Sequence, residues 1–502
     1  MIKTDVIIIG GGATGCGIAR DLALRGIPHC LIEKGDFAAG ATGACHGLLH
    51  SGGRYVVSDP HSARECYEEN IILRKIGEKC VEQTGGLFVR LPGDSKLYRD
   101  RFLKSCEKIG IPAEVISSTK ALDLVPDLNP ETEEAVKVPD CSLDPFRLCM
   151  LNIVSSQKRG GIIFIRHKVA EIIKEHGRCV GVKAADQISG ELREIRGNVI
   201  INATGAWSHL VARLAGNEVP VTLSKGSLVI TNHRLTDMVI NRMRPSADGD
   251  IIVPNEAVCL AGTTSLAVED PDKIRIESRE VDIIISEAGR MIPHFNETRI
   301  IRAFSGVRPL LKSAKTNSRE ITRGFQIIDH DDGMFSIVGG KLTTFRLMAE
   351  KMVDIVMEHF KLKKPCETAH LPLEGQEELS GYPLAKRLAD MKNIICECEL
   401  VSRADVERII AQTGTRYVGD ISHRTRLGMG PCQGGFCTFR ALGIMQEKSI
   451  VSPEQSMFAL RDFLQRRFRG IRCCLWGDQL REEQLVEYIY LGILAMERKQ
   501  WA

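Results

Sequence analysis

Four of the seventeen cysteines occur in two close pairs, a spacing that suits chemistry better than packing. One residue separates Cys396 from Cys398, four residues separate Cys432 from Cys437, and 33 residues lie between the pairs. Both pairs stand just before helical patterns, so they can converge on one thiolate site. Neighbouring glycines let backbone N–H groups point at the sulfurs and stabilise their charge. The pattern predicts an iron–sulfur cluster, a structural zinc site or, if neither is bound, unligated thiols.

A second candidate site is the spacing Gly10-x-Gly12-x-x-Gly15, which follows an apolar β-branched run and precedes a helical pattern. The first glycine suits a tight turn, the second lets the backbone approach a pyrophosphate, and the third lets the helix pack on the strand. The helix N-terminus then favours the anion. Glu33 ends the next strand, 18 residues past Gly15, where a carboxylate accepts from ribose hydroxyls and repels the extra phosphate of NADP. A purely structural glycine turn is the simpler alternative.

Two later stretches favour FAD over NAD. The apolar run 199–201 ends in Ala203-Thr204-Gly205, a second point of backbone approach that a flavin domain built from two segments uses. Residues 333–346 repeat the opening pattern of strand, glycine turn and helix. A helix N-terminus aimed at a ligand suits the electron-rich pyrimidine edge of a reduced flavin.

A third group of residues offers acid–base and anion-binding side chains. His50, Arg54 and Tyr55 flank a Gly-Gly pair, and on its own this segment is typical of a polar surface loop. Arg308 and Lys341 each follow an apolar run directly. We therefore expect both to stand at the end of a strand, which is less typical of a solvated surface charge.

Length and charge limit the class of protein. A chain of 502 residues has room for roughly two to four domains with ample core. A net charge of +3 gives no reason to expect a nucleic-acid partner. There is no apolar run of about 18 residues that could span a membrane, and a strand begins by residue 5, which leaves no room for a signal peptide. We expect a cytoplasmic protein that reaches a membrane only peripherally or through a partner.

The glycine spacing and four further motifs together resemble those of FAD-dependent glycerol-3-phosphate dehydrogenases with the D-amino-acid-oxidase-like fold. Within that family, the large catalytic subunits of the anaerobic, quinone-linked enzymes are the most similar, and the resemblance covers essentially the whole chain. The first motif is generic, whereas the order and spacing of the others are specific. These others are His46-Gly-Leu-Leu-His50-Ser-Gly-Gly-Arg54-Tyr55, Gly262-Thr-Thr-Ser265, Phe304-Ser-Gly-Val-Arg308-Pro309 and Gly339-Gly-Lys341-Leu342.

The resemblance implies a substrate site and a reaction. Arg54, Arg308 and Lys341, with Tyr55 as a weaker contact, would surround glycerol 3-phosphate, a small dianion that suits guanidinium and ammonium groups. Oxidation at C2 removes a hydride to the flavin and a proton from the hydroxyl, giving dihydroxyacetone phosphate. His50 is our candidate base; a structural histidine is the equally simple alternative, and a desolvated Lys341 is another possible base. We further expect cofactor contacts from Ala13, Thr14, Lys34, Thr42, Gly43, Ser51, Val169, Gly340, Leu342 and Thr343.

The cysteine pattern resembles that of bacterioferritin-associated-ferredoxin-like domains, which hold a [2Fe–2S] cluster. The large subunit of the anaerobic dehydrogenases has such a domain at this place. This favours a cluster over zinc, and it implies electrons passing from the flavin to companion redox and membrane-anchor subunits and a quinone pool. The chain would then sit at the cytoplasmic face of the inner membrane through those partners.

We expect an α/β fold whose Rossmann-like FAD-binding domain is of the D-amino-acid-oxidase type. The predicted FAD-binding segments are about 1–80, 145–215 and 330–360. A mixed or antiparallel substrate domain is predicted at about 81–144 and 216–329. After a loosely packed linker at 361–392 come a small α-rich iron–sulfur domain at 393–446 and a helical region at 447–502, whose last apolar stripe we expect to pack on its own domain.

Two other functions remain open from the sequence. A related flavoenzyme could oxidise a 2-hydroxy acid or an amino acid, but such a substrate needs only one carboxylate-binding arginine, whereas this chain offers three cations. Alternatively, the chain could be a non-catalytic electron-transfer or iron-handling adaptor in which the flavin is structural.

Overall fold

A six-stranded sheet organises the first unit of the computed structural model, which describes residues 1–312, 319, 321–376, 393–412, 415 and 417–493. Five neighbouring strands are parallel, and only the last pairs antiparallel. Parallel strands buried on both faces read as continuous apolar runs, as these do. In sheet order the strands are β10 (Ile162–Phe164), β3 (His29–Ile32), β2 (Val6–Ile9), β14 (Val199–Asn202), β22 (Met334–Gly339) and β21 (Phe325–Asp329).

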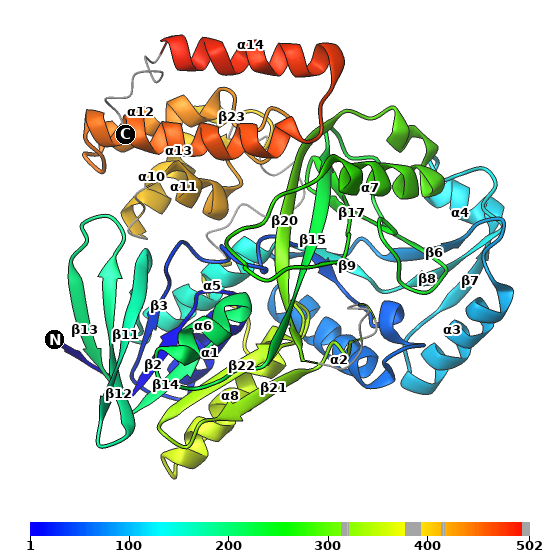
Figure 1. Cartoon of the computed structure of the whole chain (residues 1–502). Coiled ribbons are helices and arrows are strands. Elements are labelled where there is room, and N and C mark those ends of the chain that lie inside the picture. Colours follow the sequence, from blue (N-terminus) through cyan, green and yellow to red (C-terminus); the bar gives the residue numbers. More distant parts are fainter. Residues whose placement is uncertain (313–318, 320, 377–392, 413–414, 416, 494–502) are drawn as a thin grey trace.

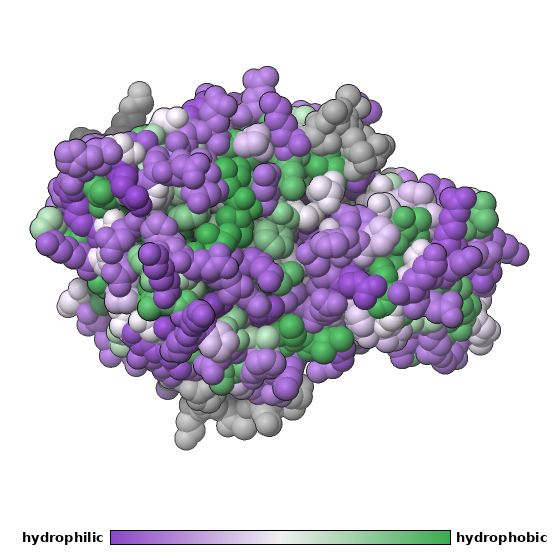
Figure 2. Space-filling model, turned by 90° about the horizontal axis from the view of Figure 1, so that it is seen from below, coloured by the Kyte–Doolittle hydropathy of each residue, from purple (hydrophilic) through white to green (hydrophobic). Residues whose placement is uncertain are grey.

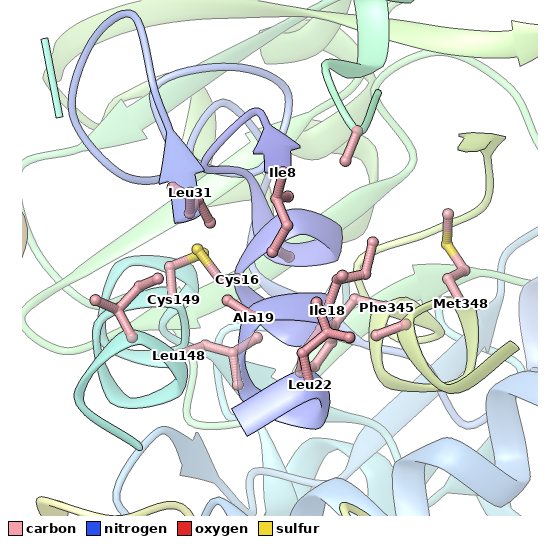
Figure 3. Packing of buried hydrophobic residues seen from close by; sticks show 14 of the residues in the cluster. Ile8, Cys16, Ile18, Ala19, Leu22, Leu31, Leu148, Cys149, Phe345 and Met348 are labelled. Atoms are coloured by element: carbon pink, nitrogen blue, oxygen red, sulfur yellow. The ribbon is translucent and has the colours of Figure 1, made fainter. Parts of the chain in front are cut away.

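Layers cover the two faces of this sheet. Helices α1 (Ala13–Leu24), α5 (Pro145–Gln157) and α8 (Phe345–His359) form one layer. In the close-up, Cys16 of α1 lies beside Cys149 of α5 among apolar side chains (Figure 3). The other face packs against a four-stranded sheet. Its strands are β1 (Ile2–Lys3), β13 (Leu192–Arg196), β12 (Arg178–Asp186) and β11 (His167–Glu175).

A nine-stranded mixed sheet forms the second unit from two separate parts of the chain. The earlier part gives β6 (Gly86–Arg90), β7 (Glu114–Ser117) and β8 (Glu134–Val138). The later part gives β15 (Val221–Thr231), β16 (Val239–Arg242), β17 (Ile251–Asn255), β18 (Val258–Gly262), β19 (Leu266–Ala267) and β20 (Ile300–Leu311). Helices α3 (Lys96–Ile109), α4 (Ser118–Leu124) and α7 (Ser278–Met291) belong to this unit (Figure 1).

A short segment carries the predicted His50 loop between the two large sheets. It is held by the three-stranded sheet of β4 (Leu48–Leu49), β9 (Cys141–Leu143) and β5 (Val81–Glu82). A 3₁₀ turn, η1 (Gly53–Tyr55), follows and leads to α2 (Pro60–Ile76). Gly52 has a φ of +95°, and a Cβ there would collide with the backbone of α2, so glycine is required where the chain turns.

The beginning of the predicted linker is attached firmly, not loosely. Buried Arg20 donates hydrogen bonds to backbone carbonyls of this segment, including that of Leu371 at 2.6 Å. Lys364 donates to the Leu24 carbonyl at 2.8 Å and so caps the end of α1. Residues 361–376 are therefore packed on the first unit, while 377–392 lie outside the described residues.

The C-terminal unit is helical around its own apolar core. A short hairpin, β23 (Ile394–Cys396) with β24 (Val401–Ser402), opens it. The helices are α10 (Arg403–Gln412), α11 (Val418–Thr425), α12 (Cys437–Glu447), α13 (Pro453–Arg472) and α14 (Gly477–Ile493). The expected packing of the last stripe holds only in part: Leu491 contacts the core, but Leu485 is 60% and Ile489 46% exposed. Residues 494–502 lie outside the described part.

Buried ion pairs hold the C-terminal unit on the first unit, which it overlies in Figure 1. Arg424 of α11 forms a two-point pair with Asp36, at 2.8 and 2.9 Å, and both side chains are buried. His423 also contacts Asp36 at 2.7 Å, and its ring stacks on Phe146 with the centroids 4.4 Å apart. Arg424, followed by the His423 hydrogen bond, holds the pKa of Asp36 well below its usual range.

None of the helices in the described residues is long and apolar enough to cross a lipid bilayer. The face in Figure 2 is mostly hydrophilic, with hydrophobic residues in small separate groups.

We expect Asp36→Asn to loosen the C-terminal unit, because it leaves the buried Arg424 guanidinium without its anion. Breaking a buried pair in this way costs about 3–5 kcal/mol, which thermal unfolding would register as a lower midpoint. The depressed pKa of Asp36 means that its stabilising effect is complete above about pH 4 and is lost as the pH falls through the folded pKa. The stability difference between the natural chain and the variant should therefore shrink in acid, and a constant difference would contradict this role.

Candidate active site and iron–sulfur centre

One cavity of about 980 Å³ joins the glycine turn after β2 to a group of cations that includes Arg308 of the nine-stranded sheet. This is near the upper end of the size range of small-molecule sites. Most of the residues predicted from the sequence line it: Gly10, Gly12, Ala13, Thr14, Glu33, Lys34, Thr42, His50, Arg54, Tyr55, Val169, Ala203, Thr204, Gly205, Arg308, Gly340, Lys341, Leu342 and Thr343. Gly15, Gly43 and Ser51 are not part of its lining.

The glycine end of the cavity has the features of a dinucleotide cradle. Gly10 has a φ of +111°, and a Cβ there would lie 2.6 Å from the Ala203 carbonyl oxygen. Helix α1 begins directly after Gly12, and Gly12, Ala13 and Thr14 all line the cavity, so the helix N-terminus favours an anion there. Glu33 accepts from the Gly11 N–H at 2.6 Å, and burial raises the pKa of this carboxyl.

Arg308 is partly buried and held against the backbone of the nine-stranded sheet. Its strand, β20, continues to Leu311, so Arg308 lies within the strand and not at its end as expected from the sequence. The guanidinium lies over Gly226 of β15, where a Cβ would be 2.7 Å from its Cζ. It donates to the Thr264 carbonyl at 3.2 Å and to the Thr263 hydroxyl. Burial, with Arg323 and the neighbouring Arg319, lowers the pKa of Arg308 to about 10.

Arg54 and Lys341 differ in how their charges are balanced. Arg54 forms a 2.9 Å ion pair with buried Asp250, and it also donates to Ser246 at 2.7 Å. The Lys341 ammonium instead donates to the Arg323 carbonyl at 2.9 Å and lies 5.3 Å from the centroid of the Tyr55 ring. The charge of Arg54 is thus largely neutralised by the protein, whereas the charge of Lys341 remains to attract an anion.

Two arginines of the cavity were missed by sequence reasoning. Arg319 and Arg323 line it beside Arg308, and burial lowers the pKa of Arg323. Arg319 forms an ion pair with Asp248 and donates to the Thr263 carbonyl at 3.0 Å. Both follow β20 in a polar stretch with no motif, so only their spacing of four residues and their number could have drawn attention to them.

His50 is buried at the same end, with its ring 5.3 Å from that of Tyr55. Its backbone N–H donates to Thr343 Oγ1, but its Nδ1 atom has no hydrogen-bond partner among the described residues. Burial, and then the charges of His46, Arg54 and Lys341, lower the pKa of His50 well below its usual range. The imidazole is therefore neutral and able to accept a proton.

Ser51 acts beneath the cavity and not in its lining. Its backbone N–H donates to Asp140 Oδ1 at 2.7 Å, and Asn241 donates to the other carboxylate oxygen at 3.2 Å. Asn241 in turn accepts from Arg54 at 3.3 Å. This chain of hydrogen bonds fixes the backbone between His50 and Arg54.

The four predicted cysteines are brought together at the base of the C-terminal unit. Cys437 interacts with both Cys396 and Cys432, and Cys398 interacts with Cys432. The Cys437 hydrogen bond and the N–H groups that follow Cys432 lower the pKa of Cys432 to about 5. The same contacts raise the pKa of Cys437. In the described parts of the chain no three candidate ligands surround a single point closely enough for one metal ion.

The loops around these thiols pack closely on them. Gly430 stands against Cys398, where an added Cβ would lie 2.5 Å from the cysteine Cβ. Backbone N–H groups of Glu399 and Gly428 point at the sulfur of Cys396. Thiols at hydrogen-bonding distance from each other and from backbone donors fit a thiolate-bound cluster.

Two family models match the chain. The first, of FAD dependent oxidoreductases, matches residues 5–354, and the second, of BFD-like [2Fe-2S] binding domains, matches residues 394–447. The second match contains all four clustered cysteines.

Known proteins resemble the chain along its whole length. The A subunit of anaerobic glycerol-3-phosphate dehydrogenase from Escherichia coli is 40% identical, covering 99% of this chain and 98% of that protein. The A1 subunit of the same enzyme from Haloferax volcanii is 42% identical, covering 98% and 90%.

Among solved structures, the FAD complex of glycerol-3-phosphate dehydrogenase from Bacillus halodurans has a TM-score of 0.68 at 20% identity, covering 95% of this chain and 96% of that one. At that identity the likeness shows the fold alone, which is the FAD oxidoreductase fold predicted from the sequence. The chain belongs to the FAD-dependent oxidoreductases and, within them, to the A subunits of anaerobic glycerol-3-phosphate dehydrogenases.

Proposed function

We propose that this chain oxidises sn-glycerol 3-phosphate to dihydroxyacetone phosphate, with FAD as the hydride acceptor. The observation that carries the proposal is the meeting, in one cavity, of a dinucleotide cradle, several partly buried cations and a neutral histidine. Relatives of the same family bear the name of this activity.

The residues of the cavity fit FAD. Gly10, Gly12 and the N-terminus of α1 would hold the pyrophosphate, and Glu33 would accept from the ribose. Thr343 and the glycines before it would lie along the flavin. When bound, FAD supplies the hydride acceptor and the [2Fe–2S] cluster supplies a one-electron carrier.

Arg308, Arg323 and Lys341 would bind the substrate phosphate. A dianion in a cavity of low polarity is stabilised by charge-assisted hydrogen bonds from guanidinium and ammonium groups. The pKa of Arg308, lowered to about 10 by burial and by its cationic neighbours, reflects the cost of enclosing these charges together. A bound dianion removes that penalty, which a singly charged carboxylate would do less completely. The site therefore favours a phosphate ester over a 2-hydroxy acid.

His50 would take the proton of the C2 hydroxyl while the hydrogen on C2 leaves with its electron pair, so that the carbon becomes a carbonyl. The imidazole is neutral and its Nδ1 atom is unpaired within the described chain. The hydrogen bond from its backbone to Thr343 fixes its position. The Tyr55 ring lies beside the imidazole, with the two ring centroids 5.3 Å apart.

Electrons would leave through Cys396, Cys398, Cys432 and Cys437. A [2Fe–2S] cluster takes two thiolates at each of two irons, which accounts for all four clustered cysteines, and the family model that matches residues 394–447 is that of [2Fe-2S] binding domains. Companion redox and membrane-anchor subunits, at the cytoplasmic face of the inner membrane, would accept the electrons for a quinone pool. The word subunit in the names of the relatives supports such companions.

Arg308→Ala should weaken substrate binding without loss of FAD. Losing a charge-assisted contact costs about 1.5–3 kcal/mol, so the KM for glycerol 3-phosphate should rise about 10- to 150-fold. Steady-state kinetics and the FAD absorbance would measure both. Arg279→Ala, which removes an exposed charge on α7, is the matched control. An unchanged KM in the Arg308 variant would rule out this residue as a phosphate ligand.

His50→Gln should lower kcat by about 10²- to 10⁴-fold, the range of general base catalysis, while glycerol 3-phosphate still binds. Because the pKa of His50 lies well below its usual range, its base form is present throughout the neutral range. The acid limb of the natural enzyme's pH profile should therefore begin well below about pH 6.5. A profile that already falls between about pH 7 and 6 would contradict the assignment.

Cys432→Ala should remove the cluster and leave the flavin reaction intact. We expect iron, acid-labile sulfide and the EPR signal of the reduced cluster in the natural protein, and their loss in the variant, while glycerol 3-phosphate still bleaches the flavin of both. One equivalent of zinc and no sulfide in the natural protein would overturn the cluster assignment. Failure of the substrate to bleach the flavin, with FAD and iron both present, would point to the adaptor function instead.

A further inference from the structure

A buried group of charged residues connects the flavin unit (the unit of the six-stranded sheet), the nine-stranded sheet and the cysteine loops, and the function proposed above does not use it. Arg426, which follows α11, donates to Glu399 at 2.9 Å and lies 3.4 Å from Asp144 of the flavin unit. Glu256 approaches it from the β17–β18 hairpin at 3.9 Å and lies 3.5 Å from Arg147. All five side chains are at most 8% exposed. Three carboxylates and two guanidiniums are thus enclosed where three parts of the chain meet.

The backbone is left-handed at two of these residues. Arg426 has a φ of +69° at the C-terminal cap of α11, and Glu256 has a φ of +52° at the tip of its hairpin. Glycine is the usual residue in this conformation because a Cβ makes it unfavourable. An arginine and a glutamate at such positions are better explained by the contacts of their side chains than by the needs of the turns.

The group also connects the two redox sites through the backbone. On the cysteine side, the N–H groups of Glu399 and of Gly428, two residues past Arg426, both point at the sulfur of Cys396. On the flavin side, Asp144 caps α5, and the preceding N–H, that of Leu143, donates to the Gly47 carbonyl at 2.6 Å. Gly47 follows His46, which lines the cavity. Arg426 therefore bridges the loop at the flavin cavity and the loop that holds the thiols.

We propose that Arg426 is a positioning residue for electron transfer, which holds the cysteine loops against the flavin unit and supplies the positive charge that favours reduction of the cluster. The inference rests on the proposed function. Each electron that leaves the reduced flavin adds one negative charge at the cluster, and a guanidinium enclosed nearby stabilises that charge. Arginine suits the place because its planar fork reaches two carboxylates at once.

The test uses the full chain with FAD and cluster bound, and the variants Arg426→Gln and Arg426→Lys. Arg426→Gln should lower the midpoint potential of the cluster in an EPR-monitored titration and slow its reduction by the flavin about tenfold or more. Glycerol 3-phosphate should bleach the flavin at the natural rate in both variants. Arg426→Lys keeps the positive charge but loses the planar guanidinium. The midpoint potential of the cluster should therefore stay near the natural value, while electron transfer from the flavin to the cluster is slowed. This variant also tests the proposal if Arg426→Gln does not fold.

Arg424→Gln is the matched control, because Arg424 ties the same helix to Asp36 of the flavin unit and has no recorded contact with the cysteine loops among the described residues. It should lower the thermal unfolding midpoint and leave the cluster potential unchanged. The proposal would be overturned if Arg426→Gln left both the cluster potential and the rate of cluster reduction unchanged. It would also be overturned if Arg424→Gln shifted the cluster potential by the same amount as Arg426→Gln. If the substrate fails to bleach the flavin of the natural chain, the proposed function fails, but photochemical reduction of the flavin still tests Arg426.

Discussion

Holding several cations together in one cavity is the constraint on which the rest of the structure depends. Arg308 donates only to a hydroxyl and carbonyls in its recorded hydrogen bonds, and Lys341 donates to a carbonyl. Cations held in this way repel one another and must be supported by rigid surroundings. The long β15–β20 pairing provides that support, because it places Gly226 next to Gly306 and lets the Arg308 guanidinium lie flat on the sheet.

Much of the fold could be predicted because local patterns determine it. The glycine turn after β2 and the carboxylate at the end of β3 each depend on residues that are neighbours in the sequence or share a strand. The four cysteines could be paired for the same reason. Arg319 and Arg323 could not be found this way, because their role depends on how the chain after β20 returns to the cavity. Arg308 was placed at a strand end because it directly follows an apolar run, yet β20 continues past it to Leu311.

The two connections between the C-terminal unit and the flavin unit have different physical characters. Arg424 and Asp36 form a compact pair in which each charge has its partner, and such a pair fixes geometry. The group around Arg426 shares two guanidiniums among three carboxylates, so a change of charge at any member is felt by the others. The compact pair suits a connection that fixes two units in place, and the shared group suits a connection that also responds to the charge of an arriving electron. Neither could be read from the sequence, because their members lie up to 388 positions apart.

The cations and the histidine of the cavity depend on each other. Burial is the main cause of the lowered pKa of His50, and the charges of Arg54, Lys341 and Arg323 add to it. A bound phosphate dianion offsets the effect of the neighbouring cations but not the effect of burial. It therefore raises the pKa of the imidazole only part of the way toward its ordinary value. The imidazole then stays unprotonated until substrate arrives and becomes a stronger base once the phosphate is in place. An uncharged alcohol of the same shape would leave the cations uncompensated and the base weak, so the phosphate contributes to reaction at C2 as well as to binding.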